Sequence, residues 1–568
     1  MQRPAPCRRP RRTTPSVEHI VTVYESTAPR GGGVPIAALL VALVTVTGLF
    51  TRPLLAIDET RYAAVALEML QRGDWLVPHL NGETYSHKPP LLFWLVLAGW
   101  KVFGVSEVWA RLVGPLSGIV ALMIVSRLAS ALWPLDARTR GWAPVITAGA
   151  LVWAAFGSLF MFDTLLACCA LLGVLGVFQA VEQGKRRGVF FLAASIALGV
   201  LSKGPVILIH VLPVALAAPW WATPRPGRRW RVWYASLLGA LALGAGGALL
   251  WAIPAGIAGG PAYQQAILLG QTAGRMTKSF AHRRPFWWYL PLLPALLFPW
   301  SLWPESWRAV RALRRAPRDA SVRFCAVWAG SGLLAFSLVS GKQLHYLLPL
   351  MPAVALLLAR GLGQREAAPL GRPWLVASVI AMLGTGVIVA GTTTMADTAI
   401  WWPHGTIYWW WALLPLSAAV MLVVWHRGRI TRNASVHALT ISTAVLLVGL
   451  QLAAARAGTV PYDTSAMAAQ VRNRMRLGHP IAMLGTYNGE YHFSGRLQAA
   501  HIDVIAVGEA PAWLRAHPNG LLLRYDRGRR PLVMDGIVAR HPFRNGWATL
   551  ASSLPPARAV PRATSLPR

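Results

Sequence analysis

The stretch VPIAALLVALVTVTGLF (34–50) decides the fold, because it is a continuous apolar run that approaches the length of a membrane-spanning helix. Similar runs recur along the 568 residues of the chain, which are 55% hydrophobic and only 13% charged. Soluble domains carry about twice that fraction of charged residues. The runs are continuous and do not alternate with polar residues, which excludes a closed β-barrel. The sequence therefore predicts an α-helical polytopic membrane protein.

The apolar runs predict about thirteen membrane spans. The expected spans are 34–50, 107–127, 143–161, 165–182, 188–202, 205–222, 233–257, 286–303, 323–340, 344–359, 374–392, 406–425 and 435–455. The run PPLLFWLVLAGWKVFGV (89–105) is also apolar. Counting it as a span, however, would place every later basic loop outside the cytoplasm, contrary to the usual distribution of Lys and Arg. We therefore expect an interfacial or re-entrant helix there.

Basic residues cluster in every second loop, counted from the basic arm RRPRR (8–12). Examples are GKRRG (184–188), RPGRRWR (225–231) and RAVRALRRAPR (308–318). Because cytoplasmic loops of membrane proteins carry the excess of Lys and Arg, the N-terminus is expected in the cytoplasm. These loops account for the net charge of +34, so the expected partner is a membrane and not a nucleic acid.

The composition also suggests the domain organisation. We expect a cytoplasmic basic arm at 1–33 and a transmembrane domain at 34–456, whose outward loop 51–106 is rich in charged residues. A small outward α/β domain is expected at 457–555, with strands at 480–487, 501–508 and 520–526, followed by a disordered tail at 556–568. The four Cys show neither a disulfide framework nor the spacing of a zinc site.

The outward loop begins with Asp58, Glu59 and Arg61, directly after the first span. The residues that follow have helical periodicity, so Asp58 has two interpretations. It is either an N-cap that accepts hydrogen bonds from free backbone N–H groups, or a carboxylate that acts on a substrate. Glu59 is expected to be a solvated residue of the first helical turn. Arg61, one turn further on, is suited to binding a carboxylate or a phosphate.

Other polar residues also lie on the outward side. Asp163 lies where one span ends and the next begins, where a lone carboxylate near hydrocarbon indicates function, with a helix N-cap as the alternative. Four further residues are candidates to bind the phosphate of a lipid: Lys88, Lys203, Arg275 and Tyr346. Carboxylates and cations in one membrane-facing cavity suit a reaction on a phosphate-bearing lipid.

With these residues assembled, the sequence resembles a known family, the aminoarabinose and protein-mannosyl transferases. The stretch DETRYAAVALEMLQRGDWLVPHLNGETYSHKPPLLFWL (58–95) is similar to the first outward loop of that family. The resemblance continues in order through FDTLLA (162–167), LSKGP (201–205), HRRPFWWYLPLLPALLFPW (282–300) and LHYLLPLMPAVALLL (344–358). It covers about residues 35–360, and the closest type of member is the lipid A aminoarabinose transferase.

The resemblance implies a multi-span GT-C glycosyltransferase that takes a sugar from a polyprenyl phosphate and inverts the anomeric centre. It implies that Asp58 is the key loop carboxylate and Asp163 the second acidic residue. Arg61 and Lys88 match residues that hold the carrier phosphate. His282 matches a His near a bound metal ion, but His87 stands where the family usually has a Glu associated with that metal. Two His would hold zinc through nitrogen as an incomplete ligand set.

The sequence thus predicts a glycosyltransferase of the bacterial inner membrane, with a polyprenyl-phosphate sugar donor and with its active site and C-terminal domain in the periplasm. Lipid A, another envelope glycan and a protein all remain open as the acceptor. A transporter is the alternative from another class. It would place ionisable groups at mid-span and show inverted repeats, whereas here the charges lie at the outward ends.

Overall fold

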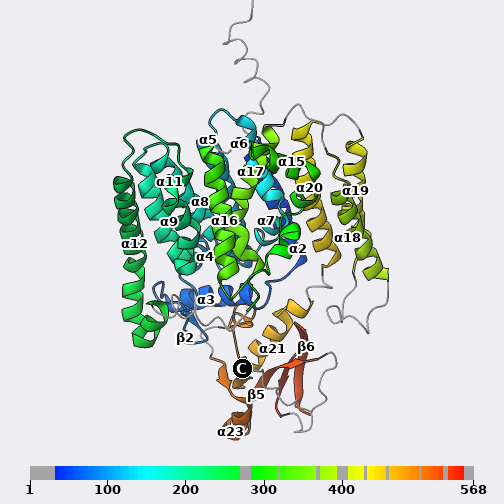
Figure 1. Ribbon diagram of the computed structural model, residues 1–568. Coiled ribbons are helices and arrows are strands. Elements are labelled where there is room, and N and C mark those ends of the chain that lie inside the picture. The colour runs from blue at the N-terminus through cyan, green and yellow to red at the C-terminus, as the bar shows by residue number, and fades with distance from the viewer. Residues whose placement is uncertain are drawn as a thin grey trace, which may run out of the picture.

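The structure, a computed structural model, describes residues 32–268, 283–315, 319–365, 371–392, 407–427, 431–455, 460–497, 501–528 and 535–554. Figure 1 shows a bundle of upright helices with a smaller, strand-containing part below it. Within the described residues, nine helical stretches are long and apolar enough to cross a membrane. The fold is that of a polytopic helical membrane protein with a small C-terminal α/β part, so the predicted fold class is confirmed.

The bundle consists of α2 (Gly33–Thr51), α5 (Glu107–Leu132), α6 (Ala137–Gly149), α7 (Leu151–Phe156), α8 (Phe162–Val181), α9 (Arg187–Lys203), η1 (Gly204–Val206), α10 (Ile207–Leu216), α11 (Ala218–Trp221), α12 (Trp230–Gln265), η3 (Leu290–Leu292), α14 (Leu293–Leu296), η4 (Trp300–Leu302), α15 (Pro304–Leu313), α16 (Ala320–Leu338), η5 (Leu344–Leu350), α17 (Met351–Gly363), α18 (Trp374–Thr392), η7 (Trp409–Ala412), α19 (Leu413–Trp425) and α20 (Arg432–Ala453). The helix α8 lies at the centre, because 83% of the residues in its most apolar 18-residue stretch are buried.

Two of the expected spans belong to one helical stretch, Arg187–Leu216. Within this stretch the chain turns back at Gly204, whose φ of +77° lies in the left-handed region that favours glycine. A Cβ atom at Gly173 of α8 would lie 2.4 Å from Ser195 Oγ of α9 and 2.6 Å from Val211 Cγ1 of α10. Since residues before and after the turn lie at the same level of α8, α9 and α10 form a hairpin.

Three other expected spans are shorter or broken, which makes the long helical stretches fewer than predicted. The span expected at 143–161 is divided between α6 and α7, and the span expected at 286–303 consists of short helical turns. Four prolines lie between residues 285 and 299, and proline lacks the N–H that a continuous helix needs. The span expected at 406–425 is the shorter apolar helix Trp409–Trp425.

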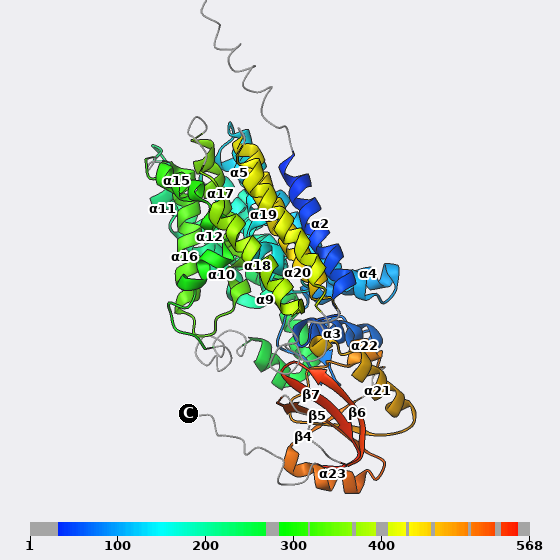
Figure 2. The same ribbon diagram turned by 90° about the vertical axis from the view of Figure 1, so that its right-hand side faces the viewer.

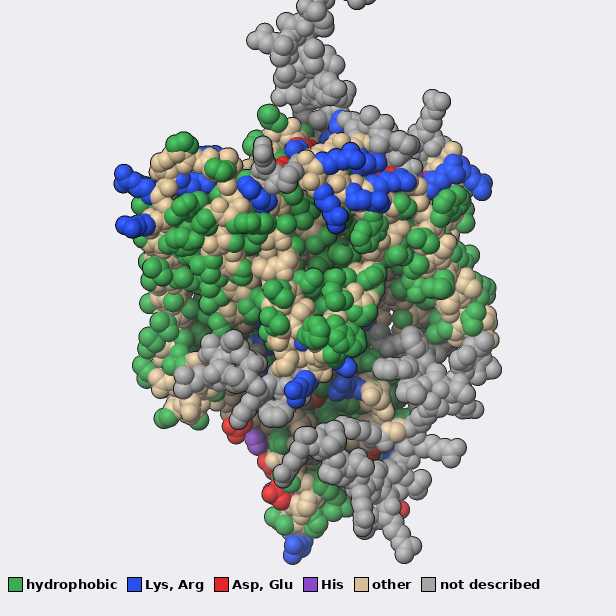
Figure 3. All heavy atoms as spheres, viewed as in Figure 1, with side chains coloured by type: hydrophobic (Ala, Val, Ile, Leu, Met, Phe, Trp, Pro, Cys, Tyr) green, Lys and Arg blue, Asp and Glu red, His purple; other side chains and the backbone are tan. Residues whose placement is uncertain are grey.

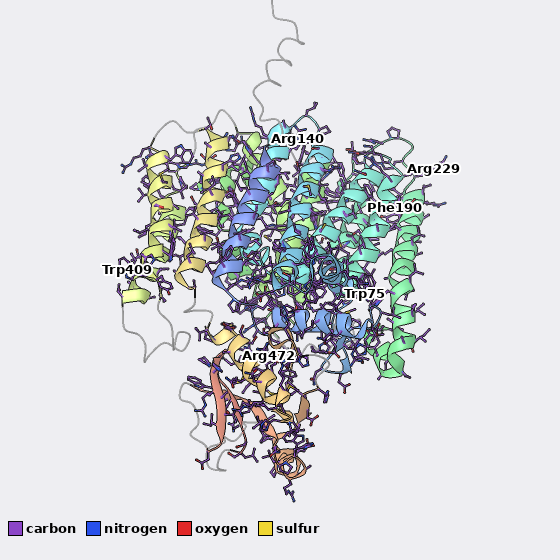
Figure 4. All side chains as sticks on the ribbon, turned by 180° about the vertical axis from the view of Figure 1, so that it is seen from behind. Trp75, Arg140, Phe190, Arg229, Trp409 and Arg472 are labelled. Carbon is purple, nitrogen blue, oxygen red and sulfur yellow. The ribbon has the colours of Figure 1, made fainter. Side chains whose placement is uncertain are left out.

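Basic side chains gather at one end of the bundle. Figure 3 shows a band of Lys and Arg along the end opposite the strand-containing part, with apolar side chains covering the wall between. Arg140 and Arg229 lie at this basic end, whereas Trp75 lies toward the other end and Arg472 lies beyond it, in the C-terminal part (Figure 4). The basic loops found in the sequence thus share one face.

The segment between α2 and α5 lies across the opposite end of the bundle. It contains α3 (Asp58–Arg72), β1 (His79–Leu80), β2 (Glu83–Thr84) and α4 (Leu91–Phe103). Figure 2 shows α3 below the bundle and α4 projecting to one side. Two side chains at the end of α4 are exposed, with 74% of Val102 and 67% of Phe103 accessible. This apolar tip suits a helix that lies in the membrane interface.

The C-terminal part contains η8 (Val460–Tyr462), α21 (Ser465–Arg476), β3 (Ile481–Leu484), α22 (His492–Gly495), β4 (Asp503–Ile505), η9 (Val507–Glu509), α23 (Ala510–Ala516), β5 (Leu521–Arg527), β6 (Ile537–Phe543) and β7 (Gly546–Ala551). Its five strands form one sheet in the order β4-β3-β5-β7-β6. The first three strands are parallel, and β7 is antiparallel to both β5 and β6. The strands β6 and β7 are additions to the three strands expected from the sequence.

The C-terminal part contacts the segment that carries α3 and α4. Asn81 donates through Nδ2 to the carbonyl of Ile502 at 2.8 Å and accepts at Oδ1 from the backbone N–H of Ile502 at 2.9 Å. The rings of Trp100 and Phe493 stack with their centroids 5.6 Å apart. These contacts fix the C-terminal part against the end of the bundle where α3 and α4 lie.

Candidate active site

The beginning of α3 carries three polar residues that contact one another. Asp58 is the first residue of the helix, 52% of its side chain is exposed, and its carboxylate forms an ion pair with Arg61. The hydroxyl of Tyr62 lies 3.5 Å from the same carboxylate oxygen. Ile57, and not Asp58, occupies the N-cap position. The carboxylate of Asp58 is therefore directed toward side chains and solvent, as a group that meets a substrate must be.

Glu59, the neighbour of Asp58, has the opposite environment, and the expectation of a solvated residue is wrong. Only 2% of Glu59 is exposed. Its carboxylate accepts a hydrogen bond of 2.6 Å from Arg52 and bonds of 2.8 Å and 2.7 Å from the backbone N–H groups of Leu55 and Phe160. A buried carboxylate needs such partners. Glu59 thus ties the end of the first span to the start of α8.

Asp163 lies at the start of α8 and is almost completely buried. Its carboxylate forms an ion pair of 2.5 Å with Lys203 at the end of α9. Nε2 of His345 lies 3.9 Å from the other carboxylate oxygen. The Nζ atom of Lys203 also lies 4.7 Å from the ring centroid of Tyr346. Three expected site residues, Asp163, Lys203 and Tyr346, are therefore brought together from distant parts of the chain.

Aromatic packing explains why the acidic residues of α3 and α8 share one site. The ring of Tyr62 meets the ring of Phe162 edge-on at 4.9 Å, and Phe93 of α4 meets Phe162 at 5.6 Å. Such edge-to-face pairs favour one relative orientation of the rings. Asp58 precedes Tyr62 by one helical turn, and Asp163 follows Phe162 directly. The contact between these two rings therefore brings the two carboxylates to the same end of the bundle.

Lys88 lies on the same side as these groups. Its Nζ atom is 5.6 Å from the ring centroid of Phe162, and its charge interacts with the carboxylate of Asp163. His345 interacts electrostatically with Asp163, Lys203, Lys88 and Asp58. Together with the ring contacts of Phe162 to Tyr62 and to Lys88, these interactions group the four charged residues at the end of the bundle opposite the basic loops.

The arrangement has two useful electrostatic properties. Burial raises the pKa of the Tyr62 hydroxyl well above its ordinary value, and the nearby charge of Asp58 adds to the effect. Tyr62 therefore keeps its proton and donates a hydrogen bond. The pairing of Asp163 with Lys203 neutralises a carboxylate that would otherwise repel an anionic substrate. Asp58 stays half exposed, and the cations Arg61 and Lys88 are partly exposed.

Two expected site residues, Arg275 and His282, lie outside the described residues. His87 is exposed, and its ring lies 5.2 Å from that of Tyr85. Within the described ranges, no three His, Cys, Asp or Glu side chains are grouped so as to hold a metal ion. The described residues do not make a zinc site, so no step is derived through a metal, and the zinc site of His87 and His282 stays a prediction.

Sequence reasoning missed His345 and Tyr62. His345 stands beside Tyr346 in SGKQLHYLLP (340–349), a short turn between two apolar runs, but only tertiary contact with Asp163 distinguishes it from a loop histidine. Tyr62 is buried through its ring, which packs on Phe162. Its hydroxyl reaches Asp58 because residues four apart lie on one helix face.

Known proteins share sequence with the part of the chain that carries several of these residues. Residues 87–251, which include Lys88, Asp163 and Lys203, match the family described as dolichyl-phosphate-mannose-protein mannosyltransferase. The undecaprenyl phosphate-alpha-4-amino-4-deoxy-L-arabinose arabinosyl transferase of Pseudomonas aeruginosa is 32% identical over 358 residues, or 60% of each chain. The chain is therefore similar to the aminoarabinose and protein-mannosyl transferases. The resemblance found in the sequence is thereby confirmed.

A second relative of the aminoarabinose transferase type, from Sodalis glossinidius, is 32% identical over 56% of this chain and 58% of its own. The chain thus spans less than two thirds of the length of these relatives. The crystal structure of ArnT from Cupriavidus metallidurans bound to undecaprenyl phosphate superimposes with a TM-score of 0.72. That comparison covers 94% of this chain and 100% of ArnT at 20% identity, so it establishes the shared fold.

Proposed function

We propose that the protein transfers a sugar from a polyprenyl phosphate carrier to an acceptor at the periplasmic face of the bacterial inner membrane. The observation that carries the proposal is the single cluster of Asp58, Arg61, Lys88 and Asp163 at the end of the bundle where α3 lies. Carboxylates and cations at the depth of the lipid headgroups suit a substrate whose sugar is attached to a lipid phosphate. The named relatives act on such a carrier.

The residues divide the chemistry between them. Lys88 and Arg61 bind the carrier phosphate and stabilise the charge that it gains as it leaves. The acceptor oxygen attacks the anomeric carbon from the face opposite the phosphate. The new C–O bond forms as the bond to the phosphate oxygen breaks, and the polyprenyl phosphate departs, which inverts the anomeric centre. Asp58 orients the acceptor, or removes its proton where the acceptor is a hydroxyl.

The acceptor we propose is lipid A or another envelope glycolipid. Three relatives at about 30% identity are bacterial aminoarabinose transferases, which favours this acceptor. A protein hydroxyl is the second candidate, favoured by the mannosyltransferase family that matches residues 87–251. A phosphate on lipid A is already ionised and needs little from a base, whereas a serine or threonine hydroxyl does need one. The two acceptors thus place different demands on Asp58.

Mass spectrometry of lipid A, periplasmic proteins and the polyprenyl phosphate pool tests the proposal in cells with and without the protein. We expect a sugar-bearing carrier to accumulate when the protein is absent and a modified lipid A to disappear. Loss of a modified protein in place of a modified lipid A would assign the second acceptor. An unchanged carrier pool with an unchanged set of acceptors would refute sugar transfer.

The proposed orientation is supported by the basic band at one end of the bundle (Figure 3). It predicts that Val507, 57% exposed in the C-terminal part, faces the periplasm. In a variant without the native Cys, Val507→Cys should react with a membrane-impermeant thiol reagent in cells whose inner membrane is intact. The control is Leu135→Cys, fully exposed in the loop between α5 and α6 at the basic end, which should react only after the inner membrane is broken. The reverse pattern would invert the orientation.

A further inference from the structure

A loop of the C-terminal part reaches α3 next to the candidate active site. The loop is GTYNGEY (485–491), between β3 and α22. At its tip, Gly489 has a φ of +75°, and a Cβ atom there would lie 2.5 Å from Leu80 Cδ1 and 3.1 Å from Ala64 Cβ. Such distances leave no room for a side chain. The loop is therefore seated directly on α3, one helical turn beyond Arg61.

Asn488 and Glu490 of this loop form a hydrogen-bonded unit. Glu490 is 0% exposed, and its carboxylate accepts from the backbone N–H of Asn488 at 2.9 Å and from Asn488 Nδ2 at 3.2 Å. Because a carboxylate only accepts, it fixes which end of the Asn488 amide is the nitrogen. The carbonyl oxygen, Oδ1, is then left to face the other way.

That oxygen faces Arg61. Nη1 of Arg61 lies 3.5 Å from Asn488 Oδ1, while Nη2 of the same guanidinium pairs with Asp58. Glu490 also interacts electrostatically with Arg61. A series of contacts thus runs from Glu490 through Asn488 and Arg61 to Asp58. Only 18% of the Arg61 side chain is exposed, and Asn488 of the loop is one of the residues that contact its guanidinium.

We propose that Asn488 and Glu490 are positioning residues that fix the guanidinium of Arg61 for sugar transfer. The inference rests on the proposed function, since it assigns to the C-terminal part a role in the same reaction. A guanidinium can pair with Asp58 in several rotamers, and only some present its remaining N–H groups to a carrier phosphate. The Asn488 carbonyl selects among them, and Glu490 holds that carbonyl in place.

The alternative is that the loop merely attaches the C-terminal part to the bundle. Attachment has other contacts, namely the two hydrogen bonds between Asn81 and Ile502 and the stacking of Trp100 on Phe493. Asn81→Ala removes attachment contacts without touching Arg61. It is therefore the matched control for Asn488→Ala, because each change truncates an Asn side chain at the same junction.

The test is a double-mutant cycle on kcat/KM for sugar transfer by purified, full-length protein in lipid vesicles, with a polyprenyl-phosphate sugar as donor and lipid A as acceptor. Asn488→Ala should lower kcat/KM about three- to tenfold, since a hydrogen bond to a charged group is lost at the long end of the distance range. In an Arg61→Ala background the same change should have no further effect, because the group that it positions is gone. Glu490→Gln should follow the same pattern with a smaller loss, and it keeps the size of the buried side chain.

Asn81→Ala should lower kcat/KM by the same factor in the wild type and in the Arg61→Ala variant, because it affects only the attachment of the C-terminal part. Equal factors for Asn488→Ala in both backgrounds would overturn the inference, and so would normal activity of Asn488→Ala. If Arg61→Ala is too slow to measure, Arg61→Lys replaces it, since Lys lacks the planar fork that Asn488 orients. If the wild type transfers sugar and the effects of Asn488→Ala and Arg61→Ala are independent, the positioning role is refuted and the proposed function stands. A wild type that transfers no sugar refutes the proposed function and this inference with it.

Discussion

Charged side chains gather at both ends of the bundle, but the carboxylate at one end is buried and the carboxylate at the other is exposed. At the basic end, Glu305 of α15 is completely buried, and its carboxylate is surrounded by three arginines, Arg308, Arg365 and Arg432, at 2.5–3.7 Å. At the other end, the carboxylate of Asp58 is half exposed and has one arginine. The first cluster is closed and holds helices together, whereas the second is open on one side. An open cluster is what a substrate requires.

The largest effect expected from this contrast is on stability. Glu305→Ala would leave three arginines without their shared anion in a buried position, which typically costs about 3–5 kcal/mol. We expect a free energy of unfolding in detergent that is lower by that amount, or failure to accumulate in the membrane. Glu83→Ala, at an exposed position of β2, is the control and should change stability by about 0.5 kcal/mol or less. Equal effects of the two changes would show that Glu305 is not a structural anchor.

The corresponding change at the open cluster is Asp58→Asn, and it should act on activity and leave stability nearly unchanged. We expect transfer to fall by roughly a hundredfold or more, the usual scale for a positioned acid–base group. Asn has nearly the same size as Asp, and its amide oxygen can still accept from Arg61, so a purely structural Asp58 would largely survive this replacement. The measurement is transfer in membranes that contain equal amounts of variant and wild-type protein. Near-normal transfer would remove Asp58 from the mechanism.

The sequence predicted the elements whose determinants are local. The helix expected from the periodicity after Asp58 is α3, and it ends at Gly73, which has a φ of +68° as a glycine terminator should. The strands β6 and β7, which an Asn-Gly turn joins at 545–546, are not among the expected strands, and β6 contains Pro542, a residue type that disfavours strands. Proline is tolerated there because β6 is an edge strand.

The part that could not be predicted depends on tertiary contacts. Asp58 and Glu59 are neighbours of the same chemical type in the same helical turn, and only the position of Arg52 and the start of α8 decides which one is buried. His345 is likewise recognisable as a site residue only from its distance to Asp163. The sequence thus picked out the polar residues that the structure brings together, but it did not separate the buried residue Glu59 from the exposed residue Asp58.

Lys88 adds a cation to the open cluster around Asp58, and its replacement tests whether that cluster binds the carrier phosphate. Lys88→Ala should weaken binding of the carrier by about 1.5–3 kcal/mol, or roughly ten- to a hundredfold, because a charge-assisted contact to phosphate is lost. Titration of the purified protein with polyprenyl phosphate measures the affinity. Lys101→Ala is the matched control, because Lys101 lies in the same segment with its Nζ atom 4.6 Å from the ring centroid of Trp75. If neither Lys88→Ala nor Arg61→Ala changes the affinity, the phosphate binds elsewhere.

The smallest expected effect concerns the hydroxyl of Tyr62, which lies 3.5 Å from the carboxylate of Asp58. Tyr62→Phe keeps the ring that packs on Phe162 and removes only the hydroxyl. A contact of this length contributes less than an ordinary hydrogen bond to a charged group, so we expect transfer to fall about two- to fivefold. The fold should be unaffected, because the buried ring remains.

The pH dependence distinguishes a hydrogen-bond donor from an acid–base group at this position. Burial raises the pKa of Tyr62 well above its ordinary value of 10.0, so the hydroxyl is protonated on both sides of neutrality. The stability that this proton contributes is fully present below pH 10.0 and is lost only as the pH rises above that value toward the raised pKa. The pH profiles of transfer for wild type and Tyr62→Phe should therefore run parallel below about pH 9. Tyr234→Phe, which removes a hydroxyl that donates to the carbonyl of Leu216 at the basic end, should leave both the rate and the profile unchanged. A wild-type profile that changes slope near neutrality, and loses that change in Tyr62→Phe, would mean that Tyr62 exchanges a proton in the reaction.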